Sequence, residues 1–181
     1  MPPFLLLLAV HIVSLVTGMG AVLVIDVFGL LWMLKRVPLA LVVRVADVTQ
    51  RLIWLGWFGL VASGIGLIMI KGSVDNLFLI KLYFVLLVGA NGIFMHTIKR
   101  ALQAAQGETL PAGVVGRIAL ASTISQVGWW GAITIGFLHN NWRGVINWPP
   151  HPAGLMVALT ALILLAAFIV ETSFRGATQK N

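Results

Sequence analysis

Two ionisable side chains occur inside long apolar runs of this sequence. His11 lies in the run from Phe4 to Leu34, and Lys81 lies in the run from Leu77 to Met95. An ionisable group at membrane depth is costly, and such groups commonly mark a substrate site, a cofactor site or a proton path. A neutral imidazole and a deprotonated lysine amine each offer a nitrogen lone pair, which suits the iron of a porphyrin. These two residues are the first candidates for chemistry.

Each of the two residues also has a simpler interpretation. Counting about 1.5 Å of rise per residue places His11 and Lys81 about 10 and 6 Å from the outer ends of their helices. At that depth Lys81 can extend to the membrane surface, and His11 can hydrogen-bond a backbone carbonyl of a neighbouring helix. The sequence alone leaves both interpretations open.

Asp26 and His96 form a second polar pair, near the opposite end of the same helices at about 33 and 29 Å. Their functional interpretation is a proton exit or a second set of ligands. We prefer the simpler interpretation, in which both are polar residues at the inner membrane surface.

His139 and His151 flank the last external loop and offer further imidazoles. With His11 they would suit an outer copper or haem site, because imidazole binds both metals. His139 is therefore the rival of Lys81 as a haem ligand. Two haems with bis-histidine ligation would need four histidines on two levels, and only His96 lies on the inner level, which excludes that arrangement.

The composition places these residues in a membrane. The chain has 181 residues, of which 60% are hydrophobic and 9% are charged, so no soluble core of this length could hide its apolar surface. It has no cysteine, which excludes disulfides, iron–sulfur clusters and thiolate-bound metals. The net charge of +7 indicates orientation in a lipid bilayer and not a nucleic-acid partner.

The predicted fold is an all-α bundle forming one transmembrane domain over residues 1–181. We expect five spanning helices, at about residues 4–34, 52–70, 77–98, 117–138 and 154–174. A surface helix is predicted at about 38–51, because Arg44, Asp47 and Arg51 recur there at three and four residues. The turn at 71–76 offers Ser73 or Asp75 as a helix cap, and polar loops are expected at 103–112 and 139–152.

Two further patterns concern packing and orientation. Small residues are frequent in the second, third and fourth helices, which predicts close helix contacts, and the fifth helix is expected at the periphery. Nine lysines and arginines fall on one predicted side and two on the other, which places the N-terminus outside and the C-terminus in the cytoplasm, as in a bacterial inner (plasma) membrane. The nine are Lys35, Arg36, Arg44, Arg51, Lys99, Arg100, Arg117, Arg175 and Lys180, and the two are Lys71 and Arg143.

Several segments carry a resemblance to a known family. They are Ala9–Ile12, Gly59–Ile68, Ile80–Leu87, His96–Leu102 and Gly107–Glu108. From Gly56 to Glu108 the chain resembles the membrane-bound protoporphyrinogen oxidases of the HemJ type and their CopD-like relatives.

The resemblance implies a haem b held by a histidine of the first helix and a lysine of the third, at the positions of His11 and Lys81. The chain departs from the family pattern at Met19 and Phe28, where the family has tryptophan and arginine, and at Arg117–Ala121, where it has an Asn-Glu pair. These departures bear on the oxidase activity more than on the fold.

We therefore expect a haem b-binding integral membrane protein for electron transfer or oxidation, with a quinone or a porphyrin as its implied partner or substrate. Two alternatives stay open: a non-catalytic membrane subunit, in a homo-oligomer or a larger complex, and a CopD-like copper-handling protein.

Overall fold

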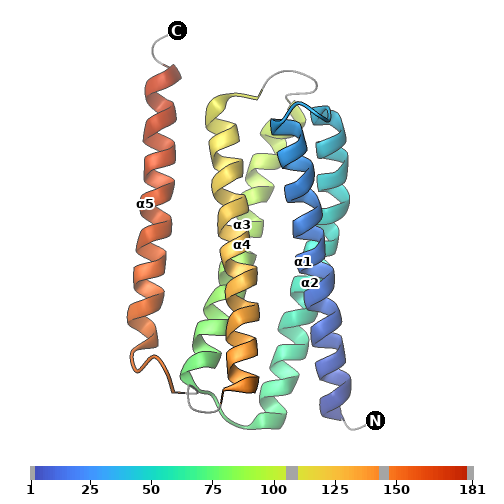
Figure 1. Ribbon diagram of the computed structural model, residues 1–181, viewed down its shortest axis with the longest axis vertical. Helices are drawn as coiled ribbons and strands as arrows, with labels where there is room; N and C mark the ends of the chain where they lie inside the picture. Colours follow the sequence, from blue (N-terminus) through green and yellow to red (C-terminus); the bar gives the residue numbers. More distant parts are fainter. Residues whose placement is uncertain (1–2, 105–109, 143–146, 179–181) are drawn as a thin grey trace. The chain divides into compact units, whose positions relative to one another are not determined.

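The computed structural model describes residues 3–104, 110–142 and 147–178, and every regular element within them is a helix (Figure 1). The five helices are α1 (Pro3–Met33), α2 (Leu39–Lys71), α3 (Asn76–Ala104), α4 (Ala112–Asn141) and α5 (Pro152–Thr178). Each is long and apolar enough to cross a membrane, which confirms the predicted class of a polytopic helical membrane protein. Helices suit this role because they satisfy their backbone hydrogen bonds internally.

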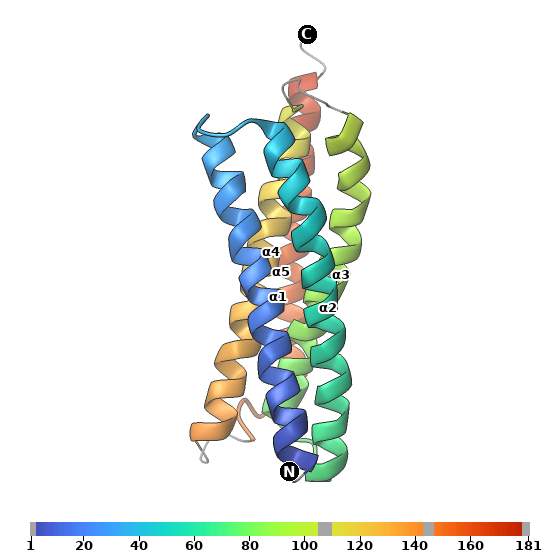
Figure 2. The ribbon, with the colours of Figure 1, turned by 90° about the vertical axis from the view of Figure 1, so that its right-hand side faces the viewer.

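The chain separates into two compact units, Met1–Val74 and Asp75–Asn181. The single domain over 1–181 stays a prediction. The first unit is the hairpin of α1 and α2, which lie side by side in both views (Figures 1 and 2). The second contains α3, α4 and α5, with α4 in contact with both of the others. No residue in the described part of α5 is buried, as expected for a peripheral helix.

The prediction of a separate surface helix at 38–51 is wrong, because α2 is one continuous helix from Leu39 to Lys71. Pro38 begins it from an extended conformation (φ −74°, ψ 151°), where the missing N–H of proline costs nothing. No proline follows within α2, and its first glycine is Gly56. Nothing in the local sequence therefore ends a helix between the charged first part and the apolar second part.

Other helix boundaries also differ from those predicted. α3 extends to Ala104 and α4 begins at Ala112, directly after Pro111, so the loop between them is shorter than 103–112. At its other end α4 continues to Asn141, which places His139 in its last turn. Several predictions rest on residues outside the described ranges, namely Gly107, Glu108, Arg143 and Lys180. The side chains of Arg100 and Arg175 are likewise not described.

Local hydrogen bonds explain where two helices begin and end. Gly72, in the left-handed conformation at φ 69°, donates its N–H to Ile68 O at 2.8 Å and ends α2. Asp75 Oδ1 accepts the N–H of Phe78 at 2.8 Å and so caps the start of α3. Of the two predicted caps, Ser73 and Asp75, the aspartate is the one that the structure uses.

Candidate functional site

The contact between α1 and α2 is made by residues without bulky side chains. A Cβ atom added at Gly56 would lie 2.6 Å from Gly18 N and 2.7 Å from Ser14 O, and one added at Gly59 would overlap the Ser14 hydroxyl. The backbones can approach this closely only because these positions are glycine. We call the contact made by Ser14, Gly18, Gly56 and Gly59 the glycine seam, and it confirms the close packing predicted for the second helix.

His11 lies beside this seam, half-buried, and is held by a defined hydrogen bond. Its Nδ1 lies 2.9 Å from the hydroxyl oxygen of Ser63 on α2, a side chain that is only 2% exposed. Ser63 Oγ lies 2.5 Å from Gly59 O and 3.3 Å from Leu60 O, so its single hydrogen is directed to its own helix backbone. Gly64 leaves room for the ring, since a Cβ there would be 3.6 Å from His11 Cε1.

The Ser63 hydroxyl favours one tautomer of the neutral His11 ring. Because the Ser63 hydroxyl donates to a carbonyl, it can only accept from the imidazole, so Nδ1 is the protonated nitrogen. In the neutral ring the lone pair is then on Nε2, which is one of the two ring nitrogens through which a neutral imidazole can bind a metal. The sequence left open a hydrogen bond from His11 to a backbone carbonyl of a neighbouring helix. In the structure the partner of His11 Nδ1 is instead the Ser63 hydroxyl, which itself donates to a backbone carbonyl.

Lys81 is half-buried in the second unit, on the side of α3 that contacts α4. Its Nζ lies 3.5 Å, and its Cε 3.8 Å, from the position that a Cβ at Gly136 would occupy. The absence of a side chain at Gly136 therefore provides the space in which the lysine lies along α4. Gly136 is one of the small residues of the predicted fourth helix, but nothing in the sequence pairs it with Lys81.

His139 lies at the end of α4 and is engaged with the start of α3. Its Nε2 is 3.5 Å from Asp75 Oδ2, the same carboxylate that caps α3 through Oδ1. The next residue, Asn76, donates from Nδ2 to the carbonyl oxygens of Asn147 and Pro149, both at 3.0 Å. Asp75 and Asn76 thus connect the start of α3 to the end of α4 and to the loop beyond it. Sequence reasoning identified only the capping role of Asp75.

The remaining predicted site residues are distributed between the two units. Asp26 is half-buried in α1, His96 is exposed in α3, and His151 is exposed before α5. The pairs His11–Lys81 and Asp26–His96 each join the first unit to the second, so both pairings stay predictions. Among the residues in the described ranges, no group of three His, Asp or Glu side chains could hold a metal ion.

Polar side chains inside the second unit hold the helix that carries Lys81. Asn91 on α3 is 7% exposed and donates from Nδ2 to Ala121 O on α4 at 2.8 Å. Tyr83 OH lies 2.9 Å from Thr160 Oγ1 on α5, and the Thr160 hydroxyl in turn contacts Met156 O at 2.8 Å. An asparagine within an apolar run is the sequence signal by which Asn91 could have been found.

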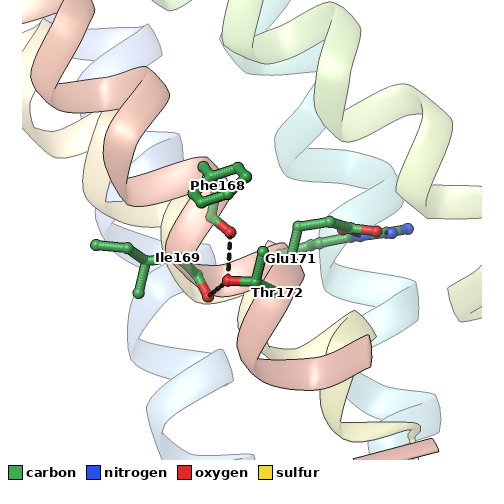
Figure 3. Close-up of polar contacts among 5 residues, drawn as sticks. Phe168, Ile169, Glu171 and Thr172 are labelled. Atoms are coloured by element: carbon green, nitrogen blue, oxygen red, sulfur yellow. Dashed lines mark hydrogen bonds and ion pairs between the residues drawn. The ribbon is translucent and has the colours of Figure 1, made fainter. Parts of the chain in front are cut away.

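An ion pair connects α4 to α5. Arg117 donates from Nε and Nη2 to Glu171 Oε2 at 3.1 and 2.7 Å. Beside Glu171, the Thr172 hydroxyl contacts the carbonyl oxygens of Phe168 and Ile169 at 2.9 and 3.1 Å (Figure 3). The side chains of Arg117 and Glu171 are 47% and 35% exposed, so we expect this ion pair to contribute little to stability.

Comparison of the chain with protein-family models, with curated proteins and with solved structures finds no match. The resemblance to the HemJ type and CopD-like proteins therefore rests on the residues named for it.

Proposed function

We propose that this chain is a haem b-binding integral membrane protein for electron transfer or oxidation, with His11 and Lys81 as the axial ligands of the iron. The observation that carries the proposal is the 2.9 Å contact between His11 Nδ1 and Ser63 Oγ, a hydroxyl whose own hydrogen is directed to Gly59 O. A metal-ligating histidine usually donates its other ring N–H to a neighbouring acceptor, which fixes the tautomer and the ring orientation. Ser63 supplies such an acceptor from within the first unit.

The donor set fits one haem iron. Histidine and an unprotonated lysine each provide one nitrogen, and a haem with these two ligands needs no third protein donor. The Lys81 amine lies in space provided by Gly136, and its stem packs on α4. His139 is the rival of Lys81 as the second ligand, and its Nε2 lies 3.5 Å from Asp75 Oδ2.

When bound, haem would supply one-electron redox chemistry. The residues of this chain would set the ligand identity, the hydrogen bond to one ligand and the burial of both. Electrons would leave through the bilayer, with a quinone or a porphyrin as the reaction partner.

The experiment is a visible spectrum and a pyridine haemochrome assay on the purified protein and its variants. We expect a Soret band in the wild type, its loss or displacement in His11→Ala and Lys81→Met, and its retention in the matched control His151→Ala. Absence of the band from the wild type, or an unchanged band in His11→Ala, would overturn the proposal. A band displaced in His139→Ala but unchanged in Lys81→Met would assign the second ligand to His139.

The same preparation separates the two alternatives. A non-catalytic subunit would co-purify with a larger complex and carry no cofactor of its own. A CopD-like copper protein would bind copper and lose it when His139 and His151 are replaced, but keep it in Lys81→Met.

The proposal includes the orientation inferred from the lysine and arginine count, with the N-terminus outside a bacterial inner membrane. A cysteine introduced at Val74 should react with a membrane-impermeant reagent in intact cells, and one introduced at Val37 should react only after lysis.

A further inference from the structure

One aspartate joins the start of α3 to the end of α4. Asp75 Oδ1 accepts the N–H of Phe78, and Asp75 Oδ2 lies 3.5 Å from Nε2 of His139. The Asp75 side chain is 9% exposed and Leu77, two residues further along, is 0% exposed, so the contact lies in packed surroundings. We call the contact of Asp75 with Phe78 and His139 the aspartate clasp.

The aspartate clasp lies close to the space that holds the Lys81 amine. Gly136 precedes His139 by three residues, which is about 4.5 Å along α4. Lys81 Nζ lies 3.5 Å from the position that a Cβ at Gly136 would occupy. Long side chains on a helix lean toward its N-terminus, so we expect the lysine to extend toward the clasp. The amine and the clasp are therefore within about one helical turn of each other along α4.

The space at Gly136 exists at one level of α4. Residues four apart lie on the same face of a helix, and the residues four before and four after Gly136 are Ala132 and Asn140, which both carry side chains. A shift of α3 along α4 by one turn would bring the Lys81 amine against one of these side chains. The lysine therefore keeps its place only while the two helices keep their level.

Contacts on both sides of Lys81 set the level of α3 against α4. Toward the end of α3, Phe84 packs on Gly131, because a Cβ there would lie 2.7 Å from the Phe84 ring. Toward the start of α3, the contact with α4 is the aspartate clasp. Asn76 also ties this start to the loop that precedes α5, through its two hydrogen bonds at 3.0 Å. The clasp thus holds the end of α3 that is nearer to Lys81.

We propose that Asp75 is a positioning residue for Lys81. By joining the start of α3 to the end of α4, it holds the lysine amine in the space at Gly136. A ligand must be held in a defined orientation by the groups around it, so loss of the clasp weakens ligation by Lys81 without removing the ligand. The role of the amine as an iron ligand rests on the proposed function, whereas its position does not.

The test measures how fast the Lys81 amine of the detergent-purified full chain reacts with acetic anhydride, quantified by peptide mass spectrometry. Lys99, half-buried on the same helix, is the internal reference, because global unfolding would raise both rates. A helix cap is worth about 1 kcal/mol, which is about fivefold in an opening equilibrium. We therefore expect Asp75→Ala to raise the ratio of the Lys81 rate to the Lys99 rate about fivefold. His139→Ala should raise this ratio by a smaller factor, because the cap on α3 remains.

The matched control is Asn91→Leu, which removes an α3–α4 hydrogen bond about 15 Å from Lys81 along α3 and should leave the ratio unchanged. An unchanged ratio in both Asp75→Ala and His139→Ala would overturn the inference, and so would an equal rise in Asn91→Leu. If Asp75→Ala does not fold, as judged by helical circular dichroism, His139→Ala carries the test.

The visible spectrum separates this inference from the proposed function. We expect the Soret band of Asp75→Ala to move toward that of Lys81→Met. A wild type without a Soret band would overturn the proposed function, whereas a raised ratio in Asp75→Ala would still support the positioning role of the clasp.

Discussion

The glycine seam gives a prediction whose size follows from measured distances. In Gly56→Ala the new Cβ would lie 2.6 Å from Gly18 N and 2.7 Å from Ser14 O. Ordinary van der Waals contacts of a Cβ begin at 3.4 Å, so α1 and α2 must separate by about 0.8 Å at this level (3.4 minus 2.6). Because both contacted atoms are backbone, no side-chain rotation can relieve the overlap.

Separating α1 and α2 by this distance removes roughly a quarter to a half of the dispersion energy between the atoms that face each other across the contact. Substitutions that overpack a site typically cost about 1–3 kcal/mol. We expect Gly56→Ala to lower the free energy of unfolding by that amount. Gly66→Ala should cost less than about 1 kcal/mol, because its Cβ meets only the flexible end of Leu7, at 2.9 Å. Gly20→Ala is the matched control, since nothing lies within 4 Å of its Cβ.

The assay is thermal or denaturant unfolding of the purified variants in one detergent, followed by circular dichroism. We expect Gly20→Ala to be the most stable of the three variants, Gly66→Ala to be intermediate and Gly56→Ala to be the least stable. Equal stability of Gly56→Ala and Gly20→Ala would refute the close contact of α1 and α2 at this level.

Three other predictions concern single side chains. Ser63→Ala should remove the acceptor of His11 Nδ1–H and lower the free energy of unfolding by about 0.6–1.7 kcal/mol. Ser63→Thr should retain the hydrogen bond, and ultraviolet resonance Raman spectra of the imidazole report the tautomer. Asp75→Ala should cost about 1 kcal/mol through loss of the cap on Phe78 N–H, and Asp75→Asn should cost less because an amide oxygen can still accept; equal losses in the two variants would contradict the capping role. Lys35→Gly should stabilise the chain by about 0.5–1 kcal/mol, because glycine adopts a positive φ without strain, and an unchanged melting temperature would argue against that backbone conformation.

The sequence predicts the helical membrane class because five apolar stretches, each long enough to span, leave no other fold open. It fails at 38–51, where the charge period of an amphipathic helix is correct but the expected break before Leu52 does not occur. Periodicity reports which side of a helix is polar and carries no information about where the helix ends. Only a proline or a glycine signal would have marked an end before Leu52, and residues 39–55 contain neither.

The sequence indicates which residues are candidates for a site, but it does not indicate which residues they contact. His11 and Lys81 stand out because they are ionisable within apolar runs, which is a property of the sequence alone. Ser63 and Gly136 do not stand out, because a serine or a glycine in a spanning helix is ordinary. Their roles depend on which residues of two helices lie at the same level, and only the packed hairpin defines that register.

The seam also connects the stability of the first unit to the chemistry proposed for His11. The His11–Ser63 bond crosses the same α1–α2 contact as Gly56 and Gly59, so a change that separates the two helices at the level of Ser63 also lengthens this bond. The distance between His11 Nδ1 and Ser63 Oγ is 2.9 Å, and it can increase by about 0.6 Å before it exceeds the 3.5 Å limit of a hydrogen bond (3.5 minus 2.9). This increase is smaller than the helix separation that Gly56→Ala requires. Gly56 lies two helical turns from Ser63, so the helices can re-close partly over that distance. If they do not, Gly56→Ala should alter the His11 tautomer as Ser63→Ala does, although it changes neither residue of the bond. If the tautomer is unaltered while stability falls, helix packing and imidazole orientation are independent properties of this hairpin.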